Sequence, residues 1–228
     1  MSINEQFLSV YREKWTDLSD NIEKLSDYSN PLLLFFDEEK YKSSDIHVMI
    51  FGQETKGWID KDNLLGTPEE VSSVYQNFFC LENFYKGYGR SSFWKAFRFF
   101  QKEIQIANPD KSIYFSWNNI NKIGKSEGVG INFKAGKIER EFFSVIASEV
   151  ELSKPDVVIF LTGPNRDCSI LHHFEDAEFI SIDSEIKTRA LAKVKSQFLP
   201  KNTIRIYHPS YFGGFNKLRK IAVSLITK

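Results

Sequence analysis

The sequence predicts an α/β fold with a mostly parallel sheet and helices on both faces. Apolar runs typical of strands alternate along the chain with amphipathic segments typical of helices. Residues 157–161 are apolar without alternation, which suits a strand buried on both faces of a parallel sheet. Parallel neighbours require crossovers, which we expect to be right-handed. No linker-like composition divides the chain, so a single domain over residues 1–228 is expected.

The first half of the chain is expected to form three helices and one strand. Apolar residues recur every three or four positions from residue 4 to 25, which predicts an N-terminal helix over about 4–27. Residues 47–51 read as a strand. Thr67 is followed by Pro and two acids, a typical helix start, and that helix is expected to run towards residue 84. Ser91 or Ser92 caps the next helix, which continues through residue 104.

The second half alternates more regularly between the two kinds of element. We expect strands at 112–117, 157–161, 178–182 and 203–207. Helices are expected at 138–152, 167–174 and 216–226. Residues 184–198 are ambiguous, and a helix is favoured there.

The overall charge and the cysteine count narrow the functional class. Thirty Lys and Arg balance thirty Asp and Glu, so a strongly basic nucleic-acid binder is excluded, although a local positive face is not. Lys217, Arg219 and Lys220 form one small basic cluster, which also suits a solvated helix face. Two cysteines provide neither a disulfide framework nor the four thiolates of an iron–sulfur cluster. With no leader-like start and no long apolar run, we expect a cytoplasmic protein that does not bind membranes.

Polar residues follow three of the expected strands at the point where each strand ends. They are Gln53-Glu54, then Asn118-Asn119-Ile120-Asn121-Lys122, and then His208-Pro209-Ser210. Because the carboxyl ends of parallel strands share one edge of a sheet, these loops are expected to line one pocket. A fourth segment, residues 87–97, adds Gly, Arg and Ser before Phe93 and Trp94.

These side chains match the chemistry needed to recognise and release a heterocyclic base. An Asn amide offers a donor and an acceptor to a base edge, and an aromatic ring can cover its face. A neutral His donates to a carbonyl oxygen whose charge grows during bond cleavage. A carboxylate orients water or stabilises a cationic sugar.

In their order along the chain, these motifs resemble those of the uracil-DNA glycosylase superfamily. The similarity runs from about Val48 to Phe212, and residues 89–97 are similar to the Asn-Arg-Phe-Trp-Lys region of the mismatch-specific branch. The resemblance implies a three-layer α/β/α sandwich around a short parallel sheet. It also implies an enzyme that flips a deaminated base, such as uracil, out of DNA and hydrolyses its glycosidic bond without metal or cofactor.

The resemblance assigns a role to each motif residue. Glu54, at the position of the water-activating residue, and His208, which would stabilise the departing base anion, are the catalytic candidates. Gln53, Asn119 and Phe93 would form the base pocket. Ser210, Tyr211 and Lys217 would contact DNA, with Tyr211 and Phe212 at the position of the wedge that enters the base stack. A monomer is expected, with DNA as its partner.

Other interpretations of the same residues remain open. Glu54 can be a solvated acid or a helix cap, and Asn119 can cap a turn. Asn118 takes the place of Asn119 if the strand is shifted by one residue. His208 can bond a loop carbonyl, while Phe93 and Trp94 can belong to the core. His172-His173 suggests a metal site, but neighbouring residues on a helix point in different directions, so both are interpreted as structural.

Two further functions compete with the glycosylase. Thr55 stands where family members commonly have Pro, and Lys56 stands where the uracil enzymes have Tyr. Those departures and the zero net charge favour a catalytically weak or inactive nucleic-acid-binding relative. A hydrolase acting on another nucleoside or a small ester is the third possibility, because one fold hosts many reactions.

Overall fold

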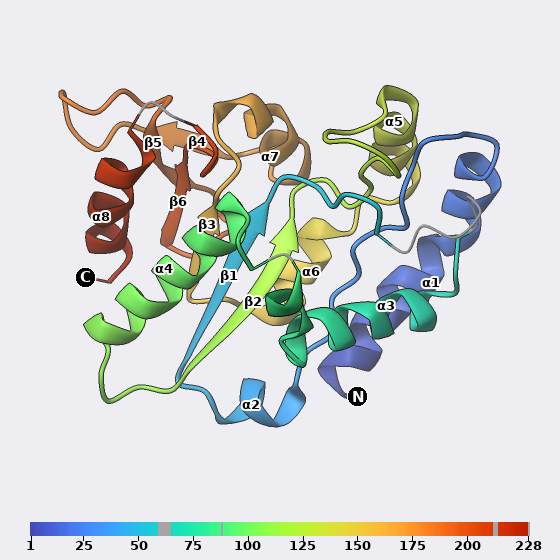
Figure 1. Ribbon diagram of the computed structural model, residues 1–228, viewed down its shortest axis with the longest axis horizontal. Coiled ribbons are helices and arrows are strands. Elements are labelled where there is room, and N and C mark those ends of the chain that lie inside the picture. Colours follow the sequence, from blue (N-terminus) through green and yellow to red (C-terminus); the bar gives the residue numbers. More distant parts are fainter. Residues whose placement is uncertain (59–64, 88, 212–213, 228) are drawn as a thin grey trace. The chain divides into compact units, whose positions relative to one another are not determined.

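The computed structural model describes residues 1–58, 65–87, 89–211 and 214–227 (Figure 1). The chain divides into two compact units, each assembled from three stretches of sequence. Unit 1 comprises Met1–Glu38, Gln53–Asn83 and Asn119–Ser153, and unit 2 comprises Glu39–Gly52, Phe84–Asn118 and Lys154–Lys228. The expectation that the whole chain acts as one domain stays a prediction.

The sheet of unit 2 has the order β2-β1-β3-β6-β5-β4 within the described residues. Its strands are β1 (Ile46–Gly52), β2 (Ile113–Asn119), β3 (Val157–Phe160), β4 (Glu178–Ile180), β5 (Leu191–Lys195) and β6 (Asn202–Ile206). Strands β1, β3 and β6 run parallel, and the arrows of β1 and β2 point the same way in Figure 1. Strands β5 and β4 add an antiparallel edge. The predicted α/β class with a mostly parallel sheet is confirmed.

The core of the sheet lies along β1 and β3. Val48 is paired with Val157 and Phe51 with Phe160, and the two Phe rings lie 4.8 Å apart between centroids. All four residues of β3 are buried, which agrees with the unbroken apolar run in the sequence. This packing fixes the strand ends from which the candidate site loops leave.

The helix favoured for residues 184–198 is wrong, because this segment contains β5. Leu191, Ala192 and Val194 are buried, whereas Lys193 and Lys195 are exposed. From Ala192 to Lys195 burial alternates with period two, as in a half-buried strand. Strand β5 pairs antiparallel with β6 on one side and with β4 on the other. These long-range partners override the weak helical spacing of the local sequence.

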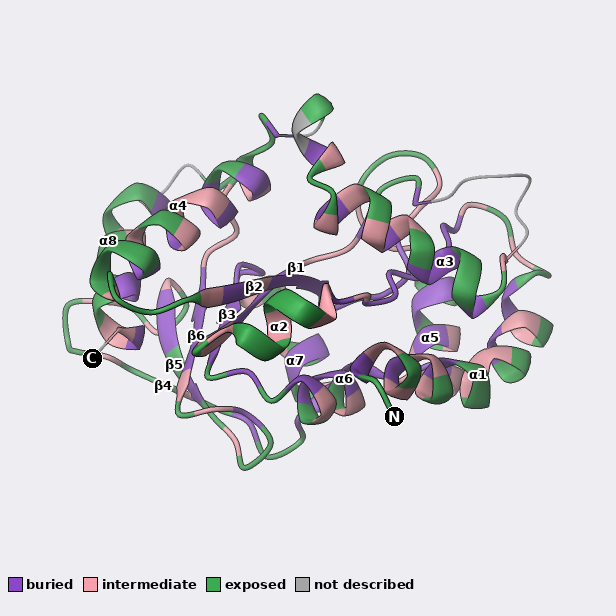
Figure 2. Ribbon diagram, turned by 90° about the horizontal axis from the view of Figure 1, so that it is seen from below, coloured by how far each residue is buried: buried purple, intermediate pink, exposed green. Residues whose placement is uncertain are grey.

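Helices cover both faces of the sheet within unit 2. Helix α4 (Ser92–Ala107) begins at its cap Ser91, whose side chain accepts a hydrogen bond from Trp94 N. Helices α4 and α8 (Phe215–Ile226) lie on one face, and α7 (Asp167–His173) lies on the other (Figure 2). The short elements are α2 (Glu38–Ser43), η2 (Asn83–Lys86) and η3 (Pro164–Arg166). This arrangement is compatible with a three-layer α/β/α fold.

Unit 1 is helical. Helix α1 (Ile3–Ile22) packs against α3 (Pro68–Tyr75), α5 (Phe133–Phe142) and α6 (Ile146–Ser153). Helix α3 starts with the predicted cap: Thr67 accepts from Glu70 N, and the Glu70 side chain accepts from Thr67 N. It continues as the π-helical turn η1 (Gln76–Cys80), so it ends before residue 84. The single helix predicted over 138–152 is two helices, because residues 143–145 interrupt it.

None of the helices in the described ranges combines the length and the apolar character needed to cross a bilayer.

Candidate functional site

The loops that follow β1 and β2 are joined in unit 1. Asn121 N donates to Gln53 O at 2.9 Å, and Gly57 N donates to Lys125 O at 3.0 Å. Asn119 is 1% exposed, whereas Gln53 and Glu54 are partly buried. The structure therefore brings together the loops of three predicted site residues, namely Gln53, Glu54 and Asn119.

Gly124 permits the close approach of these two loops. A Cβ atom at this position would lie 1.8 Å from Thr55 O, which no side chain can tolerate without moving the backbone. A third segment completes the junction, since Ser29 N donates to Gly124 O at 2.9 Å and Gly124 N donates to Ser29 Oγ at 3.2 Å. The contacts between these loops thus require glycine at position 124, because a Cβ there would collide with Thr55 O.

The carboxylate of Glu54 has a defined direction. Its Oε1 accepts a hydrogen bond from Gly130 N at 3.1 Å. Gly130 has a φ of +92°, a conformation that favours glycine. The loop after β2 thereby orients the predicted water-activating group.

A buried ionic cluster lies behind the Asn119 loop. Lys122 Nζ is 2.7 Å from Glu149 Oε1 on α6, and both side chains are fully buried. Tyr11 OH on α1 donates to the same Glu149 oxygen at 2.6 Å and accepts from Leu34 N at 3.0 Å. Burial lowers the pKa of Lys122, and the neighbouring Glu149 opposes that shift. Burial also raises the pKa of Tyr11 well above its usual value.

Glu139 on α5 anchors the backbone of the same loop. Its two carboxyl oxygens accept from Lys122 N at 2.7 Å and from Ile123 N at 3.0 Å. Burial raises the pKa of Glu139 to about 7, against the opposing effect of these two hydrogen bonds.

Sequence reasoning did not identify Glu139 and Glu149 as supports of the Asn119 loop. One signal was present, because Glu149 falls three residues after Ile146 and one before Val150, on the buried stripe of α6. An acid in an apolar stripe indicates a buried partner.

His208 lies in a tight turn of unit 2 directly after β6. Ser210 N donates to His208 Nδ1 at 3.3 Å, and Tyr211 N donates to His208 O at 2.9 Å. In the neutral imidazole this makes Nδ1 the acceptor and places the proton on Nε2. The rings of Tyr207 and Tyr211 stack with centroids 4.1 Å apart, which braces the turn. His208, Ser210 and Tyr211 therefore form one local structure.

The loop after β3 supports this turn. Gly163 N donates to Ile206 O at 3.0 Å, and a Cβ at Gly163 would lie 3.1 Å from His208 N. The positive φ of +69° and the close approach to His208 N both favour glycine at position 163. The turn that begins at Gly163 is thus a neighbour of His208.

The remaining predicted contact residues also lie in unit 2. Phe93 is partly exposed, and its ring centroid is 5.0 Å from that of Trp94 and 6.3 Å from that of Trp117. Trp94 is buried and stacks on Phe84, so Trp94 belongs to the core. Lys217 is exposed in the first turn of α8, and Phe212 lies outside the described residues.

The candidate site residues are thus divided between the two units. Gln53, Glu54 and Asn119 belong to unit 1, and Phe93, His208, Ser210, Tyr211 and Lys217 belong to unit 2. One pocket that contains both groups stays a prediction. No set of three or more His, Cys, Asp and Glu in the described part of the chain is arranged to hold a metal ion. The rings of His172 and His173 are inclined at 69° to each other.

Comparisons with known proteins leave the family open. No protein-family model matches the chain, and a search of curated proteins returns no match. The motifs and the local geometry around them are therefore the features that bear on the function of this protein.

Proposed function

We propose that this protein is a monomeric, cytoplasmic DNA glycosylase with a uracil-DNA glycosylase-like fold, which hydrolyses the N-glycosidic bond of a deaminated base such as uracil. The observation that carries the proposal is the hydrogen bond from Ser210 N to His208 Nδ1. It leaves the proton of the neutral ring on Nε2, the form of histidine that donates to a developing oxyanion.

The other residues supply the remaining parts of the reaction. The bond between C1′ and the base nitrogen breaks with its electron pair moving to the base, whose carbonyl oxygen receives the Nε2 proton as a hydrogen bond. Glu54 stabilises the cationic sugar and takes a proton from the water whose oxygen adds to C1′. Asn119 reads the base edge, and Gln53 and Phe93 line the pocket. Ser210, Tyr211 and Lys217 contact the DNA strand.

A cleavage panel tests this proposal. Duplexes and single strands that carry uracil, hypoxanthine, xanthine or mismatched thymine are incubated with the protein and then treated with alkali, which breaks the strand at an abasic site. We expect strand breaks at one or more of these bases. His208→Ala should lower the rate by about 100-fold or more, the cost of removing one oxyanion donor.

His172→Ala is the matched control, because it removes the same side chain from α7 of the same unit. It should cleave at the wild-type rate. The proposal fails if none of the substrates yields an abasic site, or if His208→Ala cleaves as fast as His172→Ala.

One observation favours the second candidate, an inactive nucleic-acid-binding relative. The Thr55 side chain is buried with its Oγ1 3.4 Å from Ser29 Oγ, so the residue that departs from the family pattern has a structural role. Salt-sensitive DNA binding without cleavage of any substrate would support this candidate.

A further inference from the structure

The zero net charge of the chain conceals a strong separation of charge between its two units. Unit 2 carries 20 Lys and Arg against 11 Asp and Glu, a formal net charge of +9. Unit 1 carries 10 basic against 19 acidic residues, a net charge of −9. The whole-chain total therefore gives a misleading picture of unit 2, which has the composition of a basic protein.

Part of this positive charge gathers on the outer side of α4. The apolar residues Trp94, Phe97, Phe100 and Ile104 form the buried stripe of the helix. Lys95, Arg98 and Lys102 follow at spacings of three and four residues on the opposite side. Lys95 and Lys102 are exposed, and they are about 10 Å apart along the helix axis.

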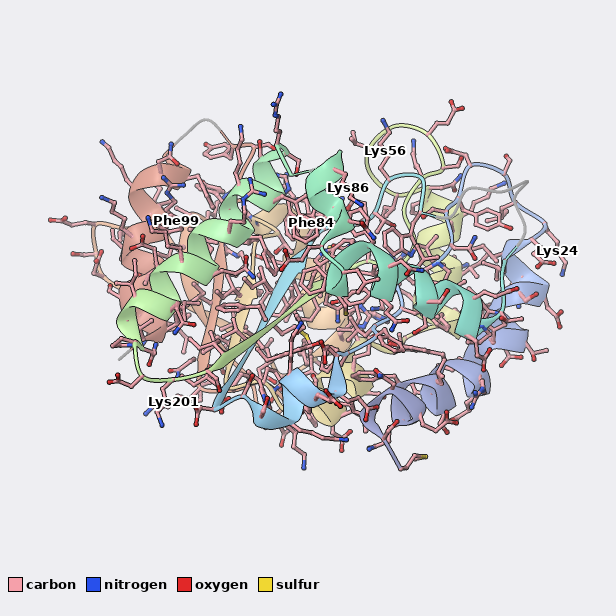
Figure 3. All side chains as sticks on the ribbon, turned by 60° about the horizontal axis from the view of Figure 1, so that its bottom comes forward. Lys24, Lys56, Phe84, Lys86, Phe99 and Lys201 are labelled. Carbon is pink, nitrogen blue, oxygen red and sulfur yellow. The ribbon has the colours of Figure 1, made fainter. Side chains whose placement is uncertain are left out.

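Helix α8 continues the positive surface. Lys217 and Lys220 are exposed, and residues 215–226 contain no acid. The Arg219 guanidinium lies 4.1 Å from the centroid of the Phe99 ring on α4, so a cation–π contact joins the two helices. Figure 3 labels Phe99 on α4 beside α8. We call Lys95, Arg98, Lys102, Lys217, Arg219 and Lys220 the α4–α8 face.

Two arginines of this face are held in place before any partner binds. Arg219 is stacked on Phe99, and Arg98 donates through Nη2 to Gly89 O. A side chain that is already ordered loses less rotamer entropy on binding than a free one does. The α4–α8 face therefore combines two guanidinium groups that already have protein contacts with four exposed ammonium groups.

We propose that the α4–α8 face binds the phosphate backbone of duplex DNA, so that the contacts already assigned to Ser210, Tyr211 and Lys217 extend to the other cations of this face. Lys95 and Lys102 span a length that covers about three phosphates of one strand. Glu103 on α4 is the only acidic residue of these two helices, which carry six Lys and Arg. Membrane insertion is disfavoured, because the large apolar residues of both helices mainly face the core. As an account of substrate binding, the inference rests on the proposed function.

The test uses undamaged duplex DNA, so that it does not depend on catalysis. Binding of a fluorescein-labelled 20-base-pair duplex is followed by anisotropy between about 50 and 200 mM salt, the range over which phosphate contacts lose most of their affinity. The variant K95A/K102A/K220A removes three exposed ammonium groups and introduces Ala, the best helix former, so the helices are retained. We expect at least a tenfold weaker affinity at the lowest salt. The slope of log K against log salt should become shallower by about 2.7, or 0.9 for each contact.

The variant K193A/K195A/K201A is the matched control. It removes the same charge from unit 2, but at the end of β5 and the start of β6, away from the strand end that carries His208. Its affinity and slope should stay near those of the wild type. The inference is overturned if both triple variants lose affinity equally, if neither loses any, or if the wild-type protein binds vesicles of anionic phospholipid but not the duplex.

The outcomes for binding and for cleavage are separable. Duplex binding that depends on the α4–α8 face, with no cleavage of any modified base, supports the inference and contradicts the glycosylase. Cleavage of uracil with an unchanged salt slope in K95A/K102A/K220A supports the glycosylase and contradicts the inference.

Discussion

Replacing Glu139 by Gln should change how the stability of the protein depends on pH. Burial raises the pKa of this carboxyl group from the usual 4.5 to about 7. The folded chain therefore holds a proton that the unfolded chain releases at a lower pH. The stabilisation is fully present below about pH 4.5 and is lost as the pH rises through about 7.

The magnitude follows from the size of the shift. A difference of about 2.5 pKa units at 1.36 kcal/mol per unit amounts to ~3 kcal/mol of unfolding free energy. Gln cannot ionise, so the variant lacks this dependence. It does carry a constant cost of about 1–3 kcal/mol, because one amide oxygen replaces two acceptors for Lys122 N and Ile123 N.

Urea unfolding at pH 5, 6, 7 and 8, followed by circular dichroism and Trp fluorescence, measures the free energy of unfolding of the wild type and of Glu139→Gln. Wild type should be the more stable of the two at pH 5. Its free energy of unfolding relative to the variant should fall by ~2.5 kcal/mol between pH 5 and pH 8, because part of the ~3 kcal/mol is already lost at pH 5. Glu141→Gln, an exposed substitution on the same helix, should follow the wild type at every pH. Parallel curves for wild type and Glu139→Gln would refute the reasoning.

Two further substitutions test the support of the Asn119 loop by the same urea titration. Lys122→Met removes the cation 2.7 Å from the buried Glu149 carboxylate and should cost about 3–5 kcal/mol, so a loss below 1 kcal/mol would contradict the buried ion pair. Gly124→Ala should cost about 3 kcal/mol or more, because its Cβ would overlap Thr55 O. Gly87→Ala is its control, since a Cβ there meets no atom within 4 Å, and equal losses in the two variants would reject the close approach.

Much of the fold follows from local signals in the sequence. The amphipathic spacing of α1, the Thr67 cap of α3 and the Ser91 cap of α4 each depend on residues within a few positions of one another. The same holds for β3, whose continuous apolar run indicates burial on both faces. Such elements are predictable because the cause lies inside the element.

Strand β5 could not be predicted from its local sequence. Residues 191–195 are too few for their alternation to outweigh helical spacing in the flanking sequence, and their pairing partners in β4 and β6 lie elsewhere in the chain. The interruption between α5 and α6 is a similar case, since apolar Phe143 and Val145 continue the helical pattern through the break.

For the candidate site, the sequence alone determined which chemical groups follow the strands: the carboxylate of Glu54, the amide of Asn119 and the imidazole of His208. The tertiary structure decided how each is held, through Gly130 N at Glu54 and Ser210 N at His208. It also decided the anchoring of the Asn119 loop by buried acids, and the division of a neutral chain into a basic and an acidic unit. The type of a side chain is a local property, whereas its burial, its partners and its share of a charged surface depend on segments that only folding brings together.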